Sequence, residues 1–325
     1  MPIPAGAPVT FDTGIFTISL DFELIWGTLD LFGPGRFRET CRRERAVVER
    51  LLDLFAEFDV SATWCTVGHL FLGECSHSGG GNHPEIVRPC HDWVSHEWFT
   101  HDPGGTEASH PAFYGRSLME KIRSCPVPQE IGCHTFSHVI FGDPGCSRAT
   151  AESELAACVK LADELGIRMR SFVFPRNRVG HLDLLRAFNF TCYRSPEPQW
   201  YEAERWPEAV KRAGHLFNVL VAKEPPVRLP ERDSDGLWHT PASMLWFPMK
   251  PGRAYNPVSL TVKRAIKGLD AAVRDKRVFH LWFHPTDMAE QTERMLPGLR
   301  AVLEYARGLR ERGDLRVLSM GDLVN

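Results

Sequence analysis

Strand-like and helix-like patterns alternate along nearly the whole chain, and this alternation is the strongest constraint on its fold. Short runs rich in β-branched and aromatic residues are separated by longer segments whose apolar residues recur at helical spacing. Such alternation predicts an α/β fold in which helices cover a parallel sheet. The expected strands are residues 15–21, 60–67, 130–134, 171–174, 191–194, 237–245, 278–284 and 315–319, and the clearest helices are 43–58, 149–165, 258–273 and 293–309.

Seven or eight strand–helix units in one chain favour a closed or nearly closed (β/α) barrel. Functional residues in such barrels gather at the carboxyl ends of the strands. Asp21, His134, Pro175 and His284 all stand at predicted strand ends. We therefore expect these positions to meet at one edge of the barrel.

The composition is that of an ordinary globular protein, and we expect one domain spanning residues 1–325. The net charge is −3 and basic residues alternate with acids, so no basic face for nucleic acid is predicted. No apolar run approaches the roughly 20 residues that cross a bilayer, and the first residues lack the pattern of a signal peptide. We expect a cytoplasmic protein without a membrane partner, whose nine scattered cysteines are reduced.

Two histidines, His134 and His138, follow an apolar run in the sequence EIGCHTFSH. If this segment turned helical, their spacing of four would place both imidazoles on one face, where they could bind one divalent cation. Two carboxylates, Asp21 and Glu23, close another strand in SLDFE and would point the same way on an extended chain. Another apolar strand ends at His284.

Together these segments resemble the polysaccharide deacetylase family, the NodB-like carbohydrate esterases. The segment His134-Thr135-Phe136-Ser137-His138 matches that family's His-Ser/Thr-x-x-His motif in full. The acids of Asp21-Phe22-Glu23 match its first motif, and His284 followed by Pro285 matches its late motif. The resemblance covers nearly the whole chain and implies an irregular, seven-stranded (β/α) barrel.

The resemblance also implies roles for these residues. Asp21 would be the general base and His284 the general acid, while Glu23, His134 and His138 would bind a divalent metal, most simply Zn²⁺. The pattern Asp-x-Glu stands in place of the family's paired aspartates, so the metal carboxylate could also be Asp21. Arg176 and Asn177 follow Pro175, whereas the family's arginine precedes its proline. These two residues could orient Asp21, bind substrate, or form a surface ion pair.

A metal held by two imidazoles and one carboxylate, with a base and an acid nearby, suits hydrolysis of an amide. The expected function is therefore a metal-dependent N-deacylase, removing acetyl or formyl from an acylamino sugar or a nucleotide-linked sugar. Two alternatives stay open: an amidase acting on a non-sugar amide or ureide, and an inactive relative that binds glycans. His284 could instead be a histidine of the core, as could His280 on the same strand.

Residues 73–128 interrupt the strand–helix rhythm and form a long insertion, which we expect over the barrel mouth as a lid. Residues 69–110 hold seven of the fourteen histidines, together with Cys75 and Cys90. Their irregular spacings favour a polar, substrate-facing segment over a second zinc site. Aromatic side chains for stacking on a sugar would be Trp93, Trp98, Phe99 and Tyr114, of which Trp98 is the candidate site residue.

Overall fold

The computed structural model describes residues 9–76, 82–197, 223–246 and 257–324. The expectations that rest on residues 1–8 and on residues 77–81 of the insertion lie outside these ranges. The strands of the main sheet are β1 (Gly14–Phe22), β2 (Thr63–Thr66), β5 (Glu130–Cys133), β6 (Ser171–Val173), β7 (Cys192–Ser195), β8 (Glu231–Arg232), β9 (Trp238–Pro241), β10 (Met244–Leu245), β11 (Val278–Phe283) and β12 (Leu315–Val317).

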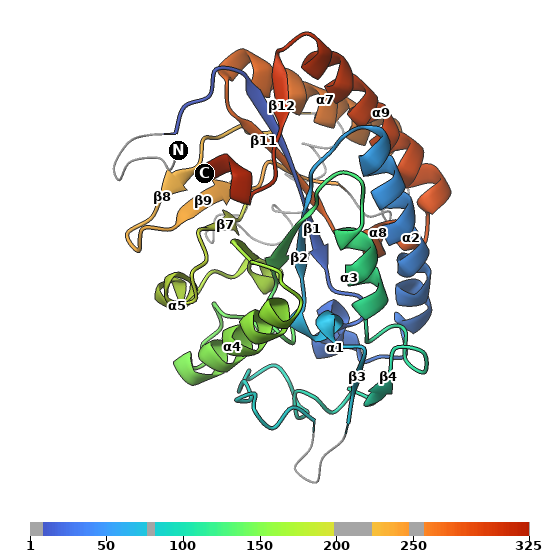
Figure 1. Cartoon of the computed structure of the whole chain (residues 1–325), viewed down its shortest axis with the longest axis vertical. Coiled ribbons are helices and arrows are strands. Elements are labelled where there is room, and N and C mark those ends of the chain that lie inside the picture. The colour runs from blue at the N-terminus through green and yellow to red at the C-terminus, as the bar shows by residue number, and fades with distance from the viewer. Residues whose placement is uncertain (1–8, 77–81, 198–222, 247–256, 325) are drawn as a thin grey trace.

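The main sheet curls into a half-barrel (Figure 1). Its order is β10-β11-β1-β2-β5-β6-β7-β9-β8, with β12 paired to β1, and only β8 runs antiparallel to its neighbour. The predicted irregular (β/α) barrel is thereby confirmed. The count of seven strands stays a prediction, because residues 198–222 and 247–256 lie outside the described ranges.

One expected strand, residues 237–245, is divided into β9 and β10. Between them, the Ala242 amide donates to the Ser195 carbonyl on β7 (3.0 Å), and the Ser243 amide donates to the His280 carbonyl on β11 (2.9 Å). This segment therefore passes from one end of the curled sheet to the other. The change of partner strand is the reason that the ladder breaks here.

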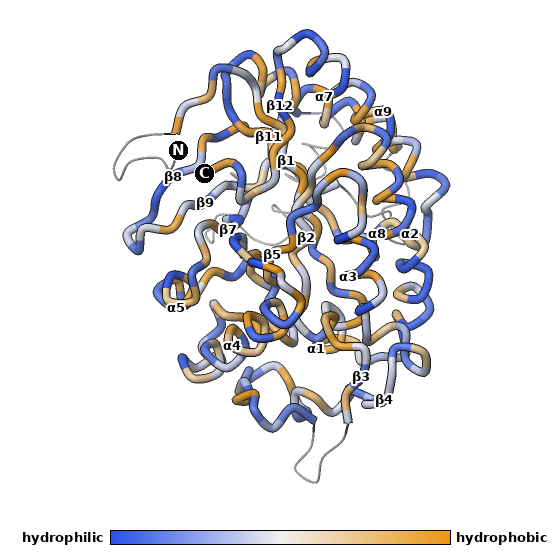
Figure 2. The backbone as a smooth tube through the Cα atoms, in the orientation of Figure 1, coloured by the Kyte–Doolittle hydropathy of each residue, from blue (hydrophilic) through white to orange (hydrophobic). Residues whose placement is uncertain are grey.

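Helices surround the sheet and bury it. They are α1 (Trp26–Phe32), α2 (Arg38–Glu57), α3 (Arg116–Arg123), α4 (Arg148–Glu164), α5 (Leu182–Ala187), α7 (Val258–Asp275), α8 (Pro285–Ala289) and α9 (Thr292–Glu311), with short 3₁₀ turns η1 (Gly68–Phe71), η2 (Pro175–Asn177) and η3 (Gly321–Val324). Hydrophobic residues run along the central strands, and hydrophilic residues mark the outer helices (Figure 2). Every residue of β1 is buried, as expected for a parallel strand covered on both faces.

The insertion lies at one end of the barrel, beside α1 (Figure 1). It contains a small antiparallel pair, β3 (Glu74–Cys75) and β4 (Gly105–Thr106), and helix α3. Trp98, Phe99 and Tyr114 are all buried within the main core, so they are not free to stack on a sugar as the sequence analysis expected, whereas Trp93 is 41% exposed. The described part of the insertion therefore packs against the main core.

All nine cysteines are free thiols, as predicted. Among the described residues, no helix is both long enough and apolar enough to cross a bilayer.

The contact between β1 and α7 depends on Gly14. A Cβ at this position would lie 2.7 Å from the Val273 amide nitrogen and 2.8 Å from the Ala272 carbonyl carbon, which belong to the α7 backbone and cannot rotate away. We expect Gly14→Ala to lower the free energy of unfolding by about 1–3 kcal/mol, the usual cost of overpacking a core. Gly35→Ala is the matched control, because no atom lies within 4 Å of its added Cβ. Equal denaturation midpoints for both variants would contradict this packing argument.

Candidate metal centre and active site

Three acceptor side chains converge where β1 and β5 end. Glu23 follows β1, His134 follows β5, and His138 lies four residues further on. The Glu23 Oε1 atom lies 2.9 Å from His134 Nε2 and 3.3 Å from His138 Nε2. All three residues are buried. The structure therefore brings together the three residues that the sequence analysis predicted as metal ligands.

Hydrogen bonding fixes the His134 ring so that it fits a cation. Its Nδ1–H donates to the Val173 carbonyl oxygen at the end of β6 (2.7 Å). With Nδ1 so engaged, Nε2 is the ring atom that faces the Glu23 carboxylate, which is how a metal-binding histidine presents its second nitrogen. Burial would raise the pKa of Glu23, but His138, His284 and His134 outweigh burial and hold it well below its usual value. This donor set suits zinc.

The segment that carries the two histidines is an irregular loop, not the helical turn considered from the sequence. Thr135 and His138 have positive φ angles of 59° and 65°, a conformation that non-glycine residues adopt rarely. Helical periodicity therefore does not bring the two imidazoles together, although their ring centroids lie 5.2 Å apart. The two left-handed residues are local strain of the kind found at functional sites.

A buried carboxylate, Glu154 of α4, holds this loop in place. Its Oε2 accepts the backbone N–H groups of Phe136 (2.7 Å) and Ser137 (2.8 Å), and its Oε1 accepts the Ser137 hydroxyl (2.6 Å). Burial raises the pKa of Glu154 to about 7, although these three donors favour the charged form. The sequence analysis did not identify Glu154, because an acid within a helix pattern normally faces solvent.

Asp21, the predicted base, is paired with a buried arginine. Arg194, on β7, donates from one guanidinium nitrogen to Asp21 Oδ1 (2.6 Å) and from the other to Oδ2 (2.7 Å). Its guanidinium also lies over the Trp282 ring, 4.2 Å from the centroid. Burial would raise the pKa of Asp21, but the charge and hydrogen bonds of Arg194 lower it below its usual value. Asp21 is thus held as a carboxylate.

Arg176 and Asn177, predicted to orient Asp21 or to bind substrate, are separated by the structure. Arg176 forms a bidentate ion pair with Asp30 of α1 and has no contact with Asp21 in the described structure. Asn177 accepts a hydrogen bond from Arg194 through its side-chain oxygen (3.2 Å) and supports Asp21 indirectly. Arg194 fills the orienting role. The sequence did contain a signal for Arg194, because a charged residue inside a predicted core strand must have a partner of opposite charge or a hydrogen-bond acceptor.

His284 stands at the end of β11, where it was predicted. Its Nε2 lies 3.7 Å from Asp21 Oδ2 and 3.8 Å from Glu23 Oε1, and its Nδ1 lies 2.8 Å from Asp287 Oδ2. The side chain is 28% exposed, whereas that of Asp21 is 4% exposed. Burial lowers the pKa of His284, but Asp287, Glu23 and Asp21 outweigh it and raise the pKa to about 10.

His280, the other histidine of this strand, is a core residue. It is fully buried, and its Nε2 lies 2.8 Å from the Ser19 hydroxyl oxygen. Burial and the nearby Arg194 lower its pKa to about 3, so it stays neutral. The preference for His284 over His280 as the strand-end histidine therefore agrees with where each one lies.

A small pocket is lined by Trp26, Leu29, Asp30, His96, Trp98 and Ser137. Two of these residues are close in sequence to candidate metal ligands, since Trp26 is three residues beyond Glu23 and Ser137 directly precedes His138. The indole N–H of Trp98 donates to the Ser137 hydroxyl (2.9 Å), which fixes the ring against the loop.

The fold is that of solved polysaccharide deacetylases and of an allantoinase. A putative polysaccharide deacetylase from Mycobacterium smegmatis is 15% identical, with a TM-score of 0.63 over 100% of this chain and 94% of that chain. The allantoinase PuuE is 12% identical, with a TM-score of 0.60 over 95% and 88% of the two chains. A probable polysaccharide deacetylase from Pseudomonas aeruginosa PAO1 is 11% identical, with a TM-score of 0.58 over 95% and 89%.

These similarities confirm, at the level of the fold, the resemblance predicted from the sequence motifs. No protein-family model and no curated protein matches the sequence itself. The residues of the site therefore have to carry the functional argument.

The position of Glu23 depends on Gly27, one turn further along the chain. A Cβ at position 27 would overlap Glu23 Oε2, and the flexible Glu23 side chain would have to move. We expect Gly27→Ala to weaken zinc binding about tenfold or more, a loss typical of disturbing a ligand's support. The free energy of unfolding of the metal-free protein should stay level or rise by up to about 1 kcal/mol, because alanine favours helix.

Zinc titration monitored with a competing chromophoric chelator would measure the affinity, with Gly35→Ala as control. Unchanged zinc affinity in Gly27→Ala would show that Glu23 does not bind the metal.

Proposed function

We propose that this protein is a metal-dependent hydrolase that removes the acyl group from an acylamino sugar. The observation that carries the proposal is the convergence of Glu23, His134 and His138 at one point, with the Asp21 carboxylate and the His284 imidazole both beside it. Similar folds serve different functions, so this proposal rests on the arrangement of these side chains and not on the fold alone.

Each side chain has a defined task in this proposal. When bound, the divalent metal, proposed to be zinc, would acidify a water molecule and polarise the acyl carbonyl. Asp21, held ionised by Arg194, accepts the proton of the attacking water. The Asp287 and Asp21 carboxylates beside His284 raise its pKa and so favour its protonated form, and its Nε2 delivers that proton to the departing nitrogen. Asp287, bonded to Nδ1, orients the ring for this transfer.

The pocket near the proposed metal ligands supports a small-molecule substrate such as a sugar. It is lined by the buried indoles of Trp26 and Trp98 and by polar atoms of Asp30, His96 and Ser137. A concave site with aromatic lining and a few fixed polar groups is typical of small-molecule binding. Arg176 contributes by holding Asp30 at the pocket edge.

Two other functions would use parts of the same site. An amidase for a non-sugar amide or ureide would need the same metal and the same acid and base, whereas an inactive glycan-binding protein would need only the pocket. Incubating the purified, zinc-loaded protein with N-acyl sugars, nucleotide-linked N-acyl sugars and ureides, and measuring released amine or acid, distinguishes the three. Turnover of ureides alone, or of no substrate, would contradict the proposed deacylase.

Variants of the two acids separate a metal ligand from a base. We expect Glu23→Ala, His134→Ala and His138→Ala each to lose one equivalent of zinc in elemental analysis. Asp21→Asn should keep that zinc and lose activity by about a hundredfold or more, the scale of a general base. The exposed Glu39→Gln is the control and should change neither quantity. Loss of zinc from Asp21→Asn, in a protein that still folds, would reverse the two roles.

His284→Ala separates a general acid from a core residue. An amide nitrogen must be protonated to depart, whereas 4-nitrophenolate leaves as an anion, so removal of the acid should harm amides selectively. We expect an activity loss of about two orders of magnitude on the N-acyl sugar and a much smaller loss on 4-nitrophenyl acetate. The comparison uses His110→Ala as control. Equal losses on both substrates would assign His284 a structural role.

A further inference from the structure

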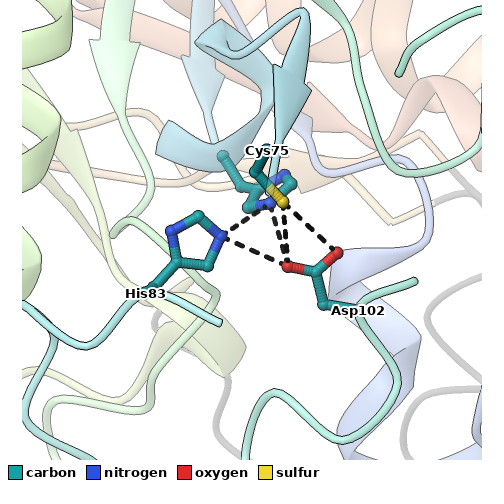
Figure 3. A group of neighbouring side chains, drawn as sticks. Cys75, His83 and Asp102 are labelled. Carbon is teal, nitrogen blue, oxygen red and sulfur yellow. Dashed lines mark hydrogen bonds and ion pairs between the residues drawn. The ribbon is translucent and has the colours of Figure 1, made fainter. Parts of the chain in front are cut away.

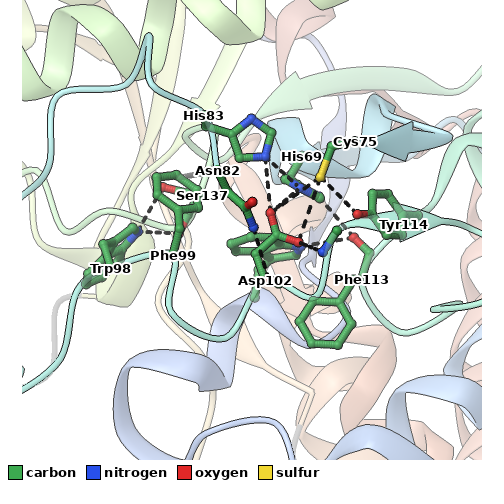
Figure 4. A network of polar contacts seen from close by, with 12 residues as sticks. His69, Cys75, Asn82, His83, Trp98, Phe99, Asp102, Phe113, Tyr114 and Ser137 are labelled. Carbon is green, nitrogen blue, oxygen red and sulfur yellow. Dashed lines mark hydrogen bonds and ion pairs between the residues drawn. The ribbon is translucent and has the colours of Figure 1, made fainter. Parts of the chain in front are cut away.

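Four potential ligands from the insertion and its flanking turn meet at a second point. They are His69 of η1, Cys75 of β3, His83 and Asp102, and their ligand atoms all lie within 4.8 Å of one another. Figure 3 shows Cys75, His83 and Asp102 pointing toward a common centre, and Figure 4 shows His69 completing the group. None of the four belongs to the Glu23–His134–His138 centre.

The spacings match a tetrahedral zinc site. His69 Nε2 lies 3.1 Å from His83 Nε2 and 3.4 Å from Asp102 Oδ2, and His83 Nε2 lies 3.2 Å from the same Oδ2. Cys75 Sγ lies 3.6 Å from that oxygen. Zinc bonds of about 2.0–2.3 Å at tetrahedral angles would separate neighbouring ligand atoms by roughly 3.3–3.7 Å. Only small movements would therefore be needed to bind the ion.

Other hydrogen bonds direct two ligand atoms at one another. His69 Nδ1 lies 3.1 Å from the Phe113 carbonyl oxygen, which can only accept, so Nδ1 carries a hydrogen and Nε2 faces the centre. The Gly104 amide donates to Asp102 Oδ1 (3.1 Å), which leaves Oδ2 for the centre. Nε2 of His69 and Oδ2 of Asp102 are thus directed at one another. A positive charge between them is the natural complement.

Burial makes an uncompensated group of this kind costly. The side chains of His69 and Asp102 are fully buried, and that of His83 is 8% exposed. His83 is also held with a φ of 50°, which is rare for a residue with a side chain.

We propose that His69, Cys75, His83 and Asp102 bind a second zinc ion with a structural role. Four protein ligands leave no open position for water or substrate, which is the mark of a structural zinc site. The Tyr114 hydroxyl, 3.0 Å from Cys75 Sγ, would donate to the bound thiolate as an outer support.

The second site contacts the loop of residues 134–138, which carries the proposed metal ligands His134 and His138. The Phe136 ring of this loop packs against the rings of both His69 (5.7 Å between centroids) and His83 (5.0 Å). The His69 amide donates to the Phe136 carbonyl (2.8 Å), and the Gly68 amide donates to the Thr135 carbonyl (2.8 Å). The ion would therefore fasten the insertion to the strained loop that positions His134 and His138.

Cobalt substitution tests this proposal independently of the catalytic centre. A cobalt–thiolate bond gives a near-ultraviolet charge-transfer band, and the Glu23–His134–His138 centre has no sulfur ligand. We expect the cobalt-loaded full-length protein to show this band, and Cys75→Ser to abolish it and to lower zinc content from about two equivalents to about one. Cys90→Ser, which removes an exposed thiol outside the cluster, should change neither.

His138→Ala separates the two sites, because it should keep the cobalt band while losing the other equivalent of metal. Absence of the band from the wild type, or its persistence in Cys75→Ser, would overturn the second site and leave the proposed deacylase unaffected. If Cys75→Ser does not fold, alkylation of the unmutated protein with iodoacetamide decides the question. Cys75 should be protected with zinc bound and modified after chelation, and equal modification in both states would overturn the proposal.

Discussion

Strand β1 is the constraint on which the rest of the structure depends. Its nine residues are all buried, and it pairs in parallel with β11, β2 and β12. Parallel pairing in fixed register brings the carboxyl ends of neighbouring strands to one edge of the barrel. Asp21 and Glu23 leave β1 at that edge, and His134 and His284 reach it from β5 and β11.

Several ionisable groups are buried at this edge, and each has a compensating partner. Asp21 has the guanidinium of Arg194, and Glu154 has two backbone amides and a hydroxyl. Buried charges are tolerated only when such partners remove the cost of desolvation. The Glu23 carboxylate has the imidazoles of His134 and His138 at 2.9 Å and 3.3 Å. In the proposed function, a bound cation would be shared by these three side chains.

The insertion and the loop of residues 134–138 are held together by direct contacts. The loop keeps two left-handed residues, Thr135 and His138, only because surrounding groups hold it from both sides. Glu154 binds its amides from α4, and η1 binds its carbonyls through Gly68 and His69. A zinc ion at the second cluster would add a link from this loop to Asp102, deep in the insertion. The histidine-rich segment, residues 69–110, would then support the active site structurally instead of covering it as a lid.

The sequence by itself determined the fold class and the strand ends at which the candidate site residues stand. Alternating periodicity predicts a parallel α/β sheet, and parallel strands place residues such as Asp21, His134 and His284 at a common edge. The tertiary structure alone decided which distant groups become partners, because burial and backbone geometry act between segments far apart in the chain. Arg194 and not Arg176 reaches Asp21, and irregular spacing conceals the meeting of His69, Cys75, His83 and Asp102. Local patterns show which side chains can perform chemistry, but only the folded chain brings them within bonding distance.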